Sequence, residues 1–235
     1  MTKTLTYRFL FYVTGLLVLA LGLTLNTKAG LGVSPIISVS FSISEITGYN
    51  FGNMTLALYC VFVLIQMTVH LFHGLKTRHT HSPLKVILLM DFLQIPLSIV
   101  FTRFLNMFAA TIPDLSSLGV QPAVELSIRF VILIAAIICT GIGAAMSLNM
   151  RLIPNPGDGI VQTIADAIHK NVGFTKNLFD LTNIAITVSL SLIFTGHIVG
   201  VGVGTILAMI GVGRTIAVFN HFTYSKMHIL AVAGH

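Results

Sequence analysis

Charged residues are scarce in this sequence. Only 9% of its 235 residues are Asp, Glu, Lys or Arg, whereas 55% are hydrophobic, and the mean hydropathy is +0.94. This composition is far from that of a water-soluble domain, and almost no polar stretch is long enough to form one. Soluble globular proteins are therefore excluded, and we expect a single integral membrane domain over residues 1–235, all-α in class.

Cysteines and catalytic patterns are also scarce. The two cysteines, Cys60 and Cys139, lie within apolar runs and lack metal-ligand spacing, so neither a disulfide framework nor a metal site is predicted. Linear order offers no Ser/His/Asp, Cys/His or paired-carboxylate arrangement and no nucleotide-binding signature. An intramembrane enzyme is therefore a minor alternative, and no cofactor is expected.

Acidic residues are fewer than basic ones, 7 against 13. The Lys and Arg residues stand mostly at the ends of apolar runs and in one loop, His70–Lys85. This distribution sets membrane orientation and indicates a lipid bilayer, not nucleic acid, as the partner. The loop also holds four histidines. With no Cys, Asp or Glu nearby to complete a metal site, a solvated basic loop is the favoured interpretation; the histidines are His70, His73, His79 and His81.

Six apolar runs are long enough to span a bilayer, which takes about 20 residues in a helix. No A-x-A-like cleavage site follows the first run, so we expect it to remain as a span. Gly15 and Gly22 in that run predict a close helix–helix contact. The six runs are about Arg8–Leu25, Met54–Leu71, Val86–Ala109, Ser127–Ser147, Leu178–Phe194 and Val201–Phe222.

Two segments interrupt this pattern, Asn26–Thr47 and Asn149–Lys170. The second contains PNPGDG, whose prolines and glycines exclude a continuous helix. Irregular backbone at membrane depth is tolerated where protein buries it or where it lines a water-filled cavity. Polar, basic and Gly/Pro positions of the two segments match at an offset of 123, so we predict two repeats, at about residues 8–110 and 125–222.

The basic N-terminus and the His70–Lys85 loop should both be cytoplasmic. An even number of crossings must then separate them, so the interrupted segments are expected to be re-entrant or to lie at the membrane interface. Each half has three crossings, which makes the halves inverted, with Lys28 outside, Arg151 inside and the C-terminus cytoplasmic. Inverted repeats with interrupted segments are a recurrent plan of secondary transporters. The alternative is eight crossings with parallel repeats.

Three Gly-rich motifs carry a family resemblance. They are GLGVSP at Gly30–Pro35, PNPGDG at Pro154–Gly159 and GVGTILAMIGVGRTI at Gly202–Ile216. Together they resemble the YczE/YyaS/YitT group of bacterial multi-pass membrane proteins, over most of the chain. The resemblance implies a bacterial inner-membrane protein with a repeated core, and it implies no substrate or catalytic residue.

Ionisable side chains inside spans require a partner or a function. Asp91 and Asp180 are of this kind. Asn177, Asp180 and Asn183 follow at spacing three, which predicts a shared helix face; they could form a polar seam or a proton or cation relay. No charged partner is evident for Asp180. For Asp91 we predict an ion pair with Arg214, from matching ILLMD to ILAMI.

Asp158 lies where a short helix begins, and helix capping is its favoured role. The alternative is that this N-terminus binds an anionic group of a substrate, with Ser34 as the equivalent in the first repeat. Asn26 and Asn149 end equivalent spans, as caps or as ligands. The candidate substrate-binding residues are Asn26, Ser34, Asn149, Asn155, Gly157, Asp158 and Gln162.

The function favoured by the sequence is that of a secondary transporter for a small solute. Intramembrane carboxylates make proton coupling a plausible mechanism. A rival is a non-transporting accessory or scaffold protein that supports a partner membrane complex. The substrate, the coupling ion and the oligomeric state, including a homo-oligomer, stay open.

Overall fold

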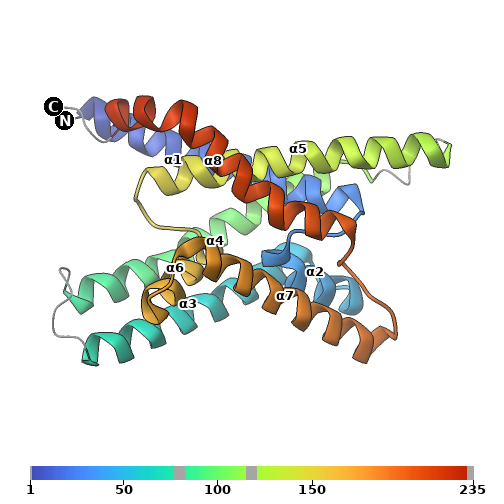
Figure 1. Ribbon diagram of the computed structural model, residues 1–235, viewed down its shortest axis with the longest axis horizontal. Coiled ribbons are helices and arrows are strands. Elements are labelled where there is room, and N and C mark those ends of the chain that lie inside the picture. The colour runs from blue at the N-terminus through green and yellow to red at the C-terminus, as the bar shows by residue number, and fades with distance from the viewer. Residues whose placement is uncertain (1, 77–82, 115–120, 232–235) are drawn as a thin grey trace. The chain divides into compact units, whose positions relative to one another are not determined.

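The computed structural model describes residues 2–76, 83–114 and 121–231 (Figure 1). These residues form helices joined by short connections and contain no strand, so the predicted all-α class is confirmed for the described part of the chain. The helices are α1 (Thr2–Ala29), α2 (Pro35–Thr47), α3 (Phe51–Lys76), α4 (Leu84–Thr111), α5 (Pro122–Asn149), α6 (Pro156–Ile168), α7 (Val172–Thr195) and α8 (Val203–Ala231).

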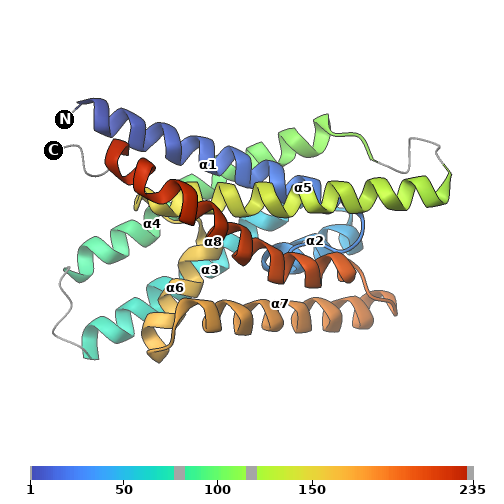
Figure 2. The same ribbon diagram turned by 45° about the horizontal axis from the view of Figure 1, so that its top comes forward.

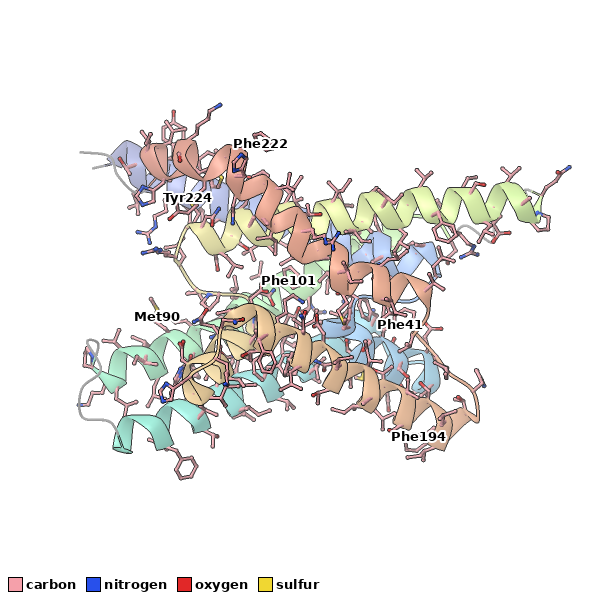
Figure 3. All side chains as sticks on the ribbon, viewed as in Figure 1. Phe41, Met90, Phe101, Phe194, Phe222 and Tyr224 are labelled. Atoms are coloured by element: carbon pink, nitrogen blue, oxygen red, sulfur yellow. The ribbon has the colours of Figure 1, made fainter. Side chains whose placement is uncertain are left out.

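Six of these helices, α1, α3, α4, α5, α7 and α8, are long and apolar enough to cross a bilayer. They contain five of the six predicted spans entirely and the sixth except for its first two residues, since α8 begins at Val203. Most extend beyond the predicted ends, because polar residues at helix ends can continue the helix into the interfacial region. Large apolar side chains face outward from them. Phe194 on α7 and Phe222 on α8 are 68% and 69% exposed (Figure 3). The protein is a multi-pass membrane protein, with surfaces suited to lipid.

The two interrupted segments contain the short helices α2 and α6, each of 13 residues. At 1.5 Å per residue each is about 20 Å long, too short for a hydrocarbon core of about 30 Å. Both begin with a proline, Pro35 and Pro156. Proline suits the first helical position because its missing N–H would have no intrahelical partner there.

The described chain divides into two compact units. Unit 1 comprises α1, α5, α8 and the end of α4; unit 2 comprises α3, α6, α7, α2 from Ile36, and α4 up to Thr102. In unit 1, α1 runs alongside α5, and α8 packs against α5 (Figure 2).

Glycine allows α1 and α5 to approach closely. A Cβ atom on Gly22 would collide with the backbone nitrogen of Thr140, and one on Gly143 would collide with that of Leu19. A Cβ on Gly15 would lie 2.7 Å from the backbone nitrogen of Ser147. The predicted contact through Gly15 and Gly22 is therefore confirmed.

Two arginines of unit 1 bind carbonyl groups at the ends of the facing helices. Arg8 Nε donates to the Met150 carbonyl at 2.7 Å, just past α5. Arg129 Nη1 donates at 2.9 Å to the carbonyl of Ala29, which is the last residue of α1. These carbonyls lack intrahelical donors, so the guanidinium groups satisfy them. The two contacts are reciprocal, since Arg129 and Met150 follow Arg8 and Ala29 by the same 121 positions.

Unit 2 holds a second set of reciprocal contacts. The Ser42 and Ser191 hydroxyls are 2.9 Å apart, and Thr163 Oγ1 lies 3.4 Å from His70 Nε2. Thr163 follows Ser42, and Ser191 follows His70, by 121 positions. The same offset relates Pro35 to Pro156 and Gly22 to Gly143. These reciprocal contacts relate residues at an offset of 121, whereas the sequence match was made at 123.

Candidate functional site

The start of α6 is capped by Asn155, not by Asp158 as predicted. Asn155 Oδ1 accepts a hydrogen bond from the Gly157 N–H at 3.1 Å. Asp158 is the third residue of the helix, too far along it to act as N-cap. The Nδ2 atom of Asn155 is buried and has no hydrogen-bond partner among the described residues. A Cβ on Gly157 would lie 2.7 Å from the side chain of Ile36, so α2 and α6 meet near their starts.

Asp158 lies in an electrostatic cluster with two residues of α7. Burial raises the pKa of Asp158 to about 6, while Lys176 lowers it and Asp180 raises it. The helix α6 is not one of the six candidate spans. A carboxyl with this pKa gains and loses a proton near physiological pH, as an acid–base group in a coupling site must.

Asp180 is the most deeply buried charged residue of this cluster. It is 0% exposed, and its Oδ2 atom contacts Lys176 Nζ at 2.6 Å, one turn earlier on α7. The expectation that Asp180 lacks a charged partner was therefore wrong. Its other oxygen, Oδ1, is buried without a hydrogen-bond partner among the described residues. A buried carboxylate oxygen in that state is costly, which marks the position as one that a proton, a water molecule or a ligand would stabilise.

The predicted face of α7 is only partly correct. Asn183 is buried and donates to the Phe179 carbonyl at 2.9 Å, within its own helix. Asn177 is exposed, so it does not share the buried face with Asp180. The buried polar face continues instead through Thr187 and Ser191.

Aromatic side chains of unit 2 pack together in the core of the same unit. Tyr59 is 1% exposed; its ring centroid lies 6.1 Å from that of Phe62 and 6.1 Å from that of Phe101. Phe62 in turn lies 5.3 Å from Phe179 of α7 in an edge-on arrangement. Tyr59 and Asp158 also interact electrostatically. An apolar surrounding lowers the local dielectric and strengthens interactions between the charges of the cluster.

A second polar network joins α3 and α4. His70 Nδ1 lies 2.7 Å from Asp91 Oδ2. Gln94 and Gln66 exchange two hydrogen bonds, of 3.0 and 3.2 Å, through their side-chain amides. His70 was expected in a solvated loop, but α3 continues to Lys76 and His70 is part of it. His79 and His81 lie outside the described residues, and His73 is described only as part of α3.

Three of the candidate binding residues belong to unit 1. Asn26 Oδ1 accepts a short hydrogen bond from the Ser34 N–H, and Asn26 Nδ2 is buried without a partner in the described part of the chain. Asn149 donates to Asn220 Oδ1 at 2.8 Å. Asn26 and Asn149, which were predicted to be equivalent, make different contacts. At an offset of 121, Ser34 corresponds to Asn155.

The remaining candidates are placed elsewhere. Gln162 is exposed on α6 and donates to Asp166 at 3.0 Å, so it does not face the buried cluster. Arg214 is exposed on α8 in unit 1. Its ion pair with Asp91 stays a prediction, although Asp91 already contacts His70.

The cluster in unit 2 therefore combines Asp158, Lys176 and Asp180 with the capping residue Asn155. Sequence reasoning missed Lys176, and it assigned His70 to a solvated loop. The i, i+4 spacing of Lys176 and Asp180 was a signal for the first. Across residues 2–76, 83–114 and 121–231, no three His, Cys, Asp or Glu side chains come together as metal ligands would. The chemistry that the cluster offers is proton exchange and polar ligand binding.

Comparison with known proteins identifies the family. The sequence model of the family described as "Family of unknown function (DUF6198)" matches residues 6–221 of this chain. The chain is also 26% identical over 215 residues to the "Uncharacterized protein YyaS" of Bacillus subtilis (strain 168), which covers 90% of this chain and 92% of that protein. No solved structure matches. The predicted resemblance to YyaS-like proteins is confirmed, and the chain belongs to the family of unknown function DUF6198.

Proposed function

We propose that this protein is a secondary transporter that moves a small polar solute across the bacterial cytoplasmic membrane. One observation carries the proposal: Asp180 is fully buried within an apolar span, and one of its carboxylate oxygens has no hydrogen-bond partner among the described residues. A charge in this position is expensive and marks an ion, proton or substrate pathway by default.

An inverted arrangement of the two halves supports transport. Helices α1 to α4 have 28, 13, 26 and 28 residues, and α5 to α8 have 28, 13, 24 and 29 in the same order. Within each unit the contacts are reciprocal, as expected for two copies related by a twofold axis. Three spans in each half then give the halves opposite orientations, with both termini in the cytoplasm. Many secondary transporters place their sites at interrupted helices of this kind.

Charge and hydrogen bonding suggest the class of solute. With all three groups ionised, Asp158, Asp180 and Lys176 carry a net charge of −1, which favours a proton or another cation. The anion-binding alternative for α6 is disfavoured, because Asp158 already occupies the first turn, where an anion would bind. Asn155 Nδ2 makes no hydrogen bond of ordinary geometry among the described residues, although this side chain interacts with Tyr59, so it could still donate to a solute. We therefore propose a neutral or cationic solute with at least one hydrogen-bond acceptor.

Proton coupling follows from the same cluster. Uptake of one proton by Asp158 or Asp180 neutralises the cluster, and its release restores the negative charge. A cationic solute and a proton then compete for the same charge, which is the basis of exchange. For a neutral solute, protonation would instead accompany binding. The direction of proton movement distinguishes these two mechanisms.

The test is flux in proteoliposomes that contain this protein alone. Candidate solutes, namely primary amines, quaternary amines and neutral amides, are added outside, and a trapped pH-sensitive dye reports proton movement. We expect at least one solute to elicit proton movement, and the Lys176→Gln/Asp180→Asn variant to lose the response. If every solute is silent although the protein is folded, the transport proposal fails, and the accessory role becomes the better explanation.

A further inference from the structure

The His70–Asp91 contact is separate from the cluster used in the proposed function. His70 is near the end of α3, with its side chain 24% exposed; Asp91 is on α4, with its side chain 6% exposed. Nδ1 and Oδ2 are 2.7 Å apart, the distance of a strong charge-assisted hydrogen bond. The imidazole is thus partly exposed, and its Nδ1 contacts a buried carboxylate.

This pair is connected to α6 at two places. His70 Nε2 lies 3.4 Å from Thr163 Oγ1, in the middle of α6. Gln94 Nε2 lies 3.5 Å from Asp91 Oδ1, and Gln94 is bonded to Gln66, which donates to the Pro156 carbonyl at 3.4 Å. The side chains of α3 and α4 therefore hold both the first turn and the middle of α6.

Charge balance gives the pair its chemistry. Asp91 is buried, and the pair is electrically neutral when one additional proton is held between the imidazole and the carboxyl. None of the other charged groups on α4, α6 and α7 named below replaces His70 as the partner of Asp91, because each is paired elsewhere or exposed. Lys176 and Asp180 are paired with each other, Asp158 belongs to their cluster, and both Lys85 on α4 and Asp166 on α6 are exposed. Loss of the proton leaves a buried anion without a cation, which is strongly unfavourable.

We propose that His70 and Asp91 form a second proton-binding site, and that the bound proton fastens α6 to α3 and α4. A proton from water binds Nε2 of the partly exposed imidazole while Nδ1–H faces Asp91, and the neutral pair then holds the Gln94–Gln66 amides and the Thr163 contact in place. When the proton leaves, the Asp91 anion draws in water, and these contacts to α6 weaken. The inference rests on the proposed function only for its use in transport, where α6 carries Asp158.

The test measures how often α6 separates from α3 and α4, through the rate at which a buried cysteine on α6 is labelled. It needs no solute. Ala165 is 1% exposed on α6, so a cysteine there reacts with a maleimide only when α6 loosens. The background is the full chain in detergent with Cys60→Ala and Cys139→Ala. The Asp166→Cys variant has an exposed thiol, so its labelling rate gives the intrinsic pH dependence of thiol reactivity. The labelling rate of Ala165→Cys is divided by this rate at each pH.

We expect the normalised rate to rise with pH, by at most about tenfold per pH unit for a single linked proton. His70→Lys, with a fixed charge, should keep the rate low across the pH range. Should that variant fold poorly, the neutral His70→Gln/Asp91→Asn pair serves instead and should give a pH-independent rate. His197→Gln is the matched control, since His197 is an exposed histidine of unit 2, and it should keep the pH dependence.

An unchanged pH dependence in His70→Lys or in the double variant overturns the inference, as does a flat profile in the parent. Because the labelling rate is measured without flux, its outcome is independent of the transport test. Loss of transport with intact pH-dependent labelling refutes the proposed function alone. Transport with pH-independent labelling refutes the second proton site alone.

Discussion

At the scale of single residues, Lys176 changes what a substitution of Asp180 reports. The two side chains are 2.6 Å apart, and Lys176 is 26% exposed. Asp180→Asn therefore leaves a half-buried cation without its partner, at a cost of about 1–3 kcal/mol. We expect this variant to have a lower thermal midpoint, and Lys176→Gln/Asp180→Asn to recover part of the loss. Thermal unfolding of the purified variants at one pH checks this. If the double variant loses the sum of both single losses, the two residues are not coupled.

Asp158 gives a prediction about pH. Its pKa in the folded protein is about 6, above its ordinary value of 3.8. The folded state therefore holds more protons than the unfolded state between these values, and stability falls as pH rises from about 4 to about 6. Asp158→Asn removes this pH-dependent contribution to the stability of the folded state. We expect its thermal midpoint to change less over this range and to exceed that of the parent at pH 7.5. Equal pH profiles for the two proteins would refute the raised pKa.

At the scale of helices, the α1–α5 contact depends on the absence of side chains. Gly143→Ala places a methyl group against the Leu19 backbone. Backbone atoms of a helix cannot move aside on their own, so α1 and α5 must separate to make room for it. Overpacking of this kind costs about 1–3 kcal/mol. Gly213→Ala on α8 is the control, because a Cβ there meets nothing within 4 Å; it should be neutral or stabilise the helix. Thermal midpoints that fall equally in both variants would show that the close contact is not the cause.

The helices were predictable to different degrees. The six spans could be predicted because length and hydropathy alone decide them, and Gly and Pro located both short helices. The cap of α6 could not be predicted, since Asn155 and Asp158 both suit an N-cap and only backbone geometry selects one. His70 was missed because it follows an apolar run next to basic residues, where only tertiary structure shows the contact with Asp91.

At the scale of the whole chain, each compact unit is built from helices of both halves. Polar contacts join the two halves within each unit: Ser42 of the first half contacts Ser191 of the second, and Arg8 binds the end of α5. The sequence match was made at an offset of 123, whereas the reciprocal contacts relate residues at an offset of 121. Sequence similarity in the loops and spatial equivalence of the helices need not share one offset, because loops tolerate insertions.

Topology is the property of the whole chain that the inverted arrangement predicts most directly. Tyr49 precedes α3 and is 66% exposed; Lys170 precedes α7 and is also exposed, 121 positions later. In inverted halves these equivalent connections lie on opposite sides of the membrane, like the predicted positions of Lys28 and Arg151. We therefore expect Tyr49→Cys to react with an impermeant maleimide in intact spheroplasts, and Lys170→Cys to react only in inverted vesicles. The background lacks Cys60 and Cys139, and permeabilised membranes, where both should react, provide the control. Reaction of both from the same side would mean parallel repeats, and the twofold argument for transport would fall with the inverted arrangement.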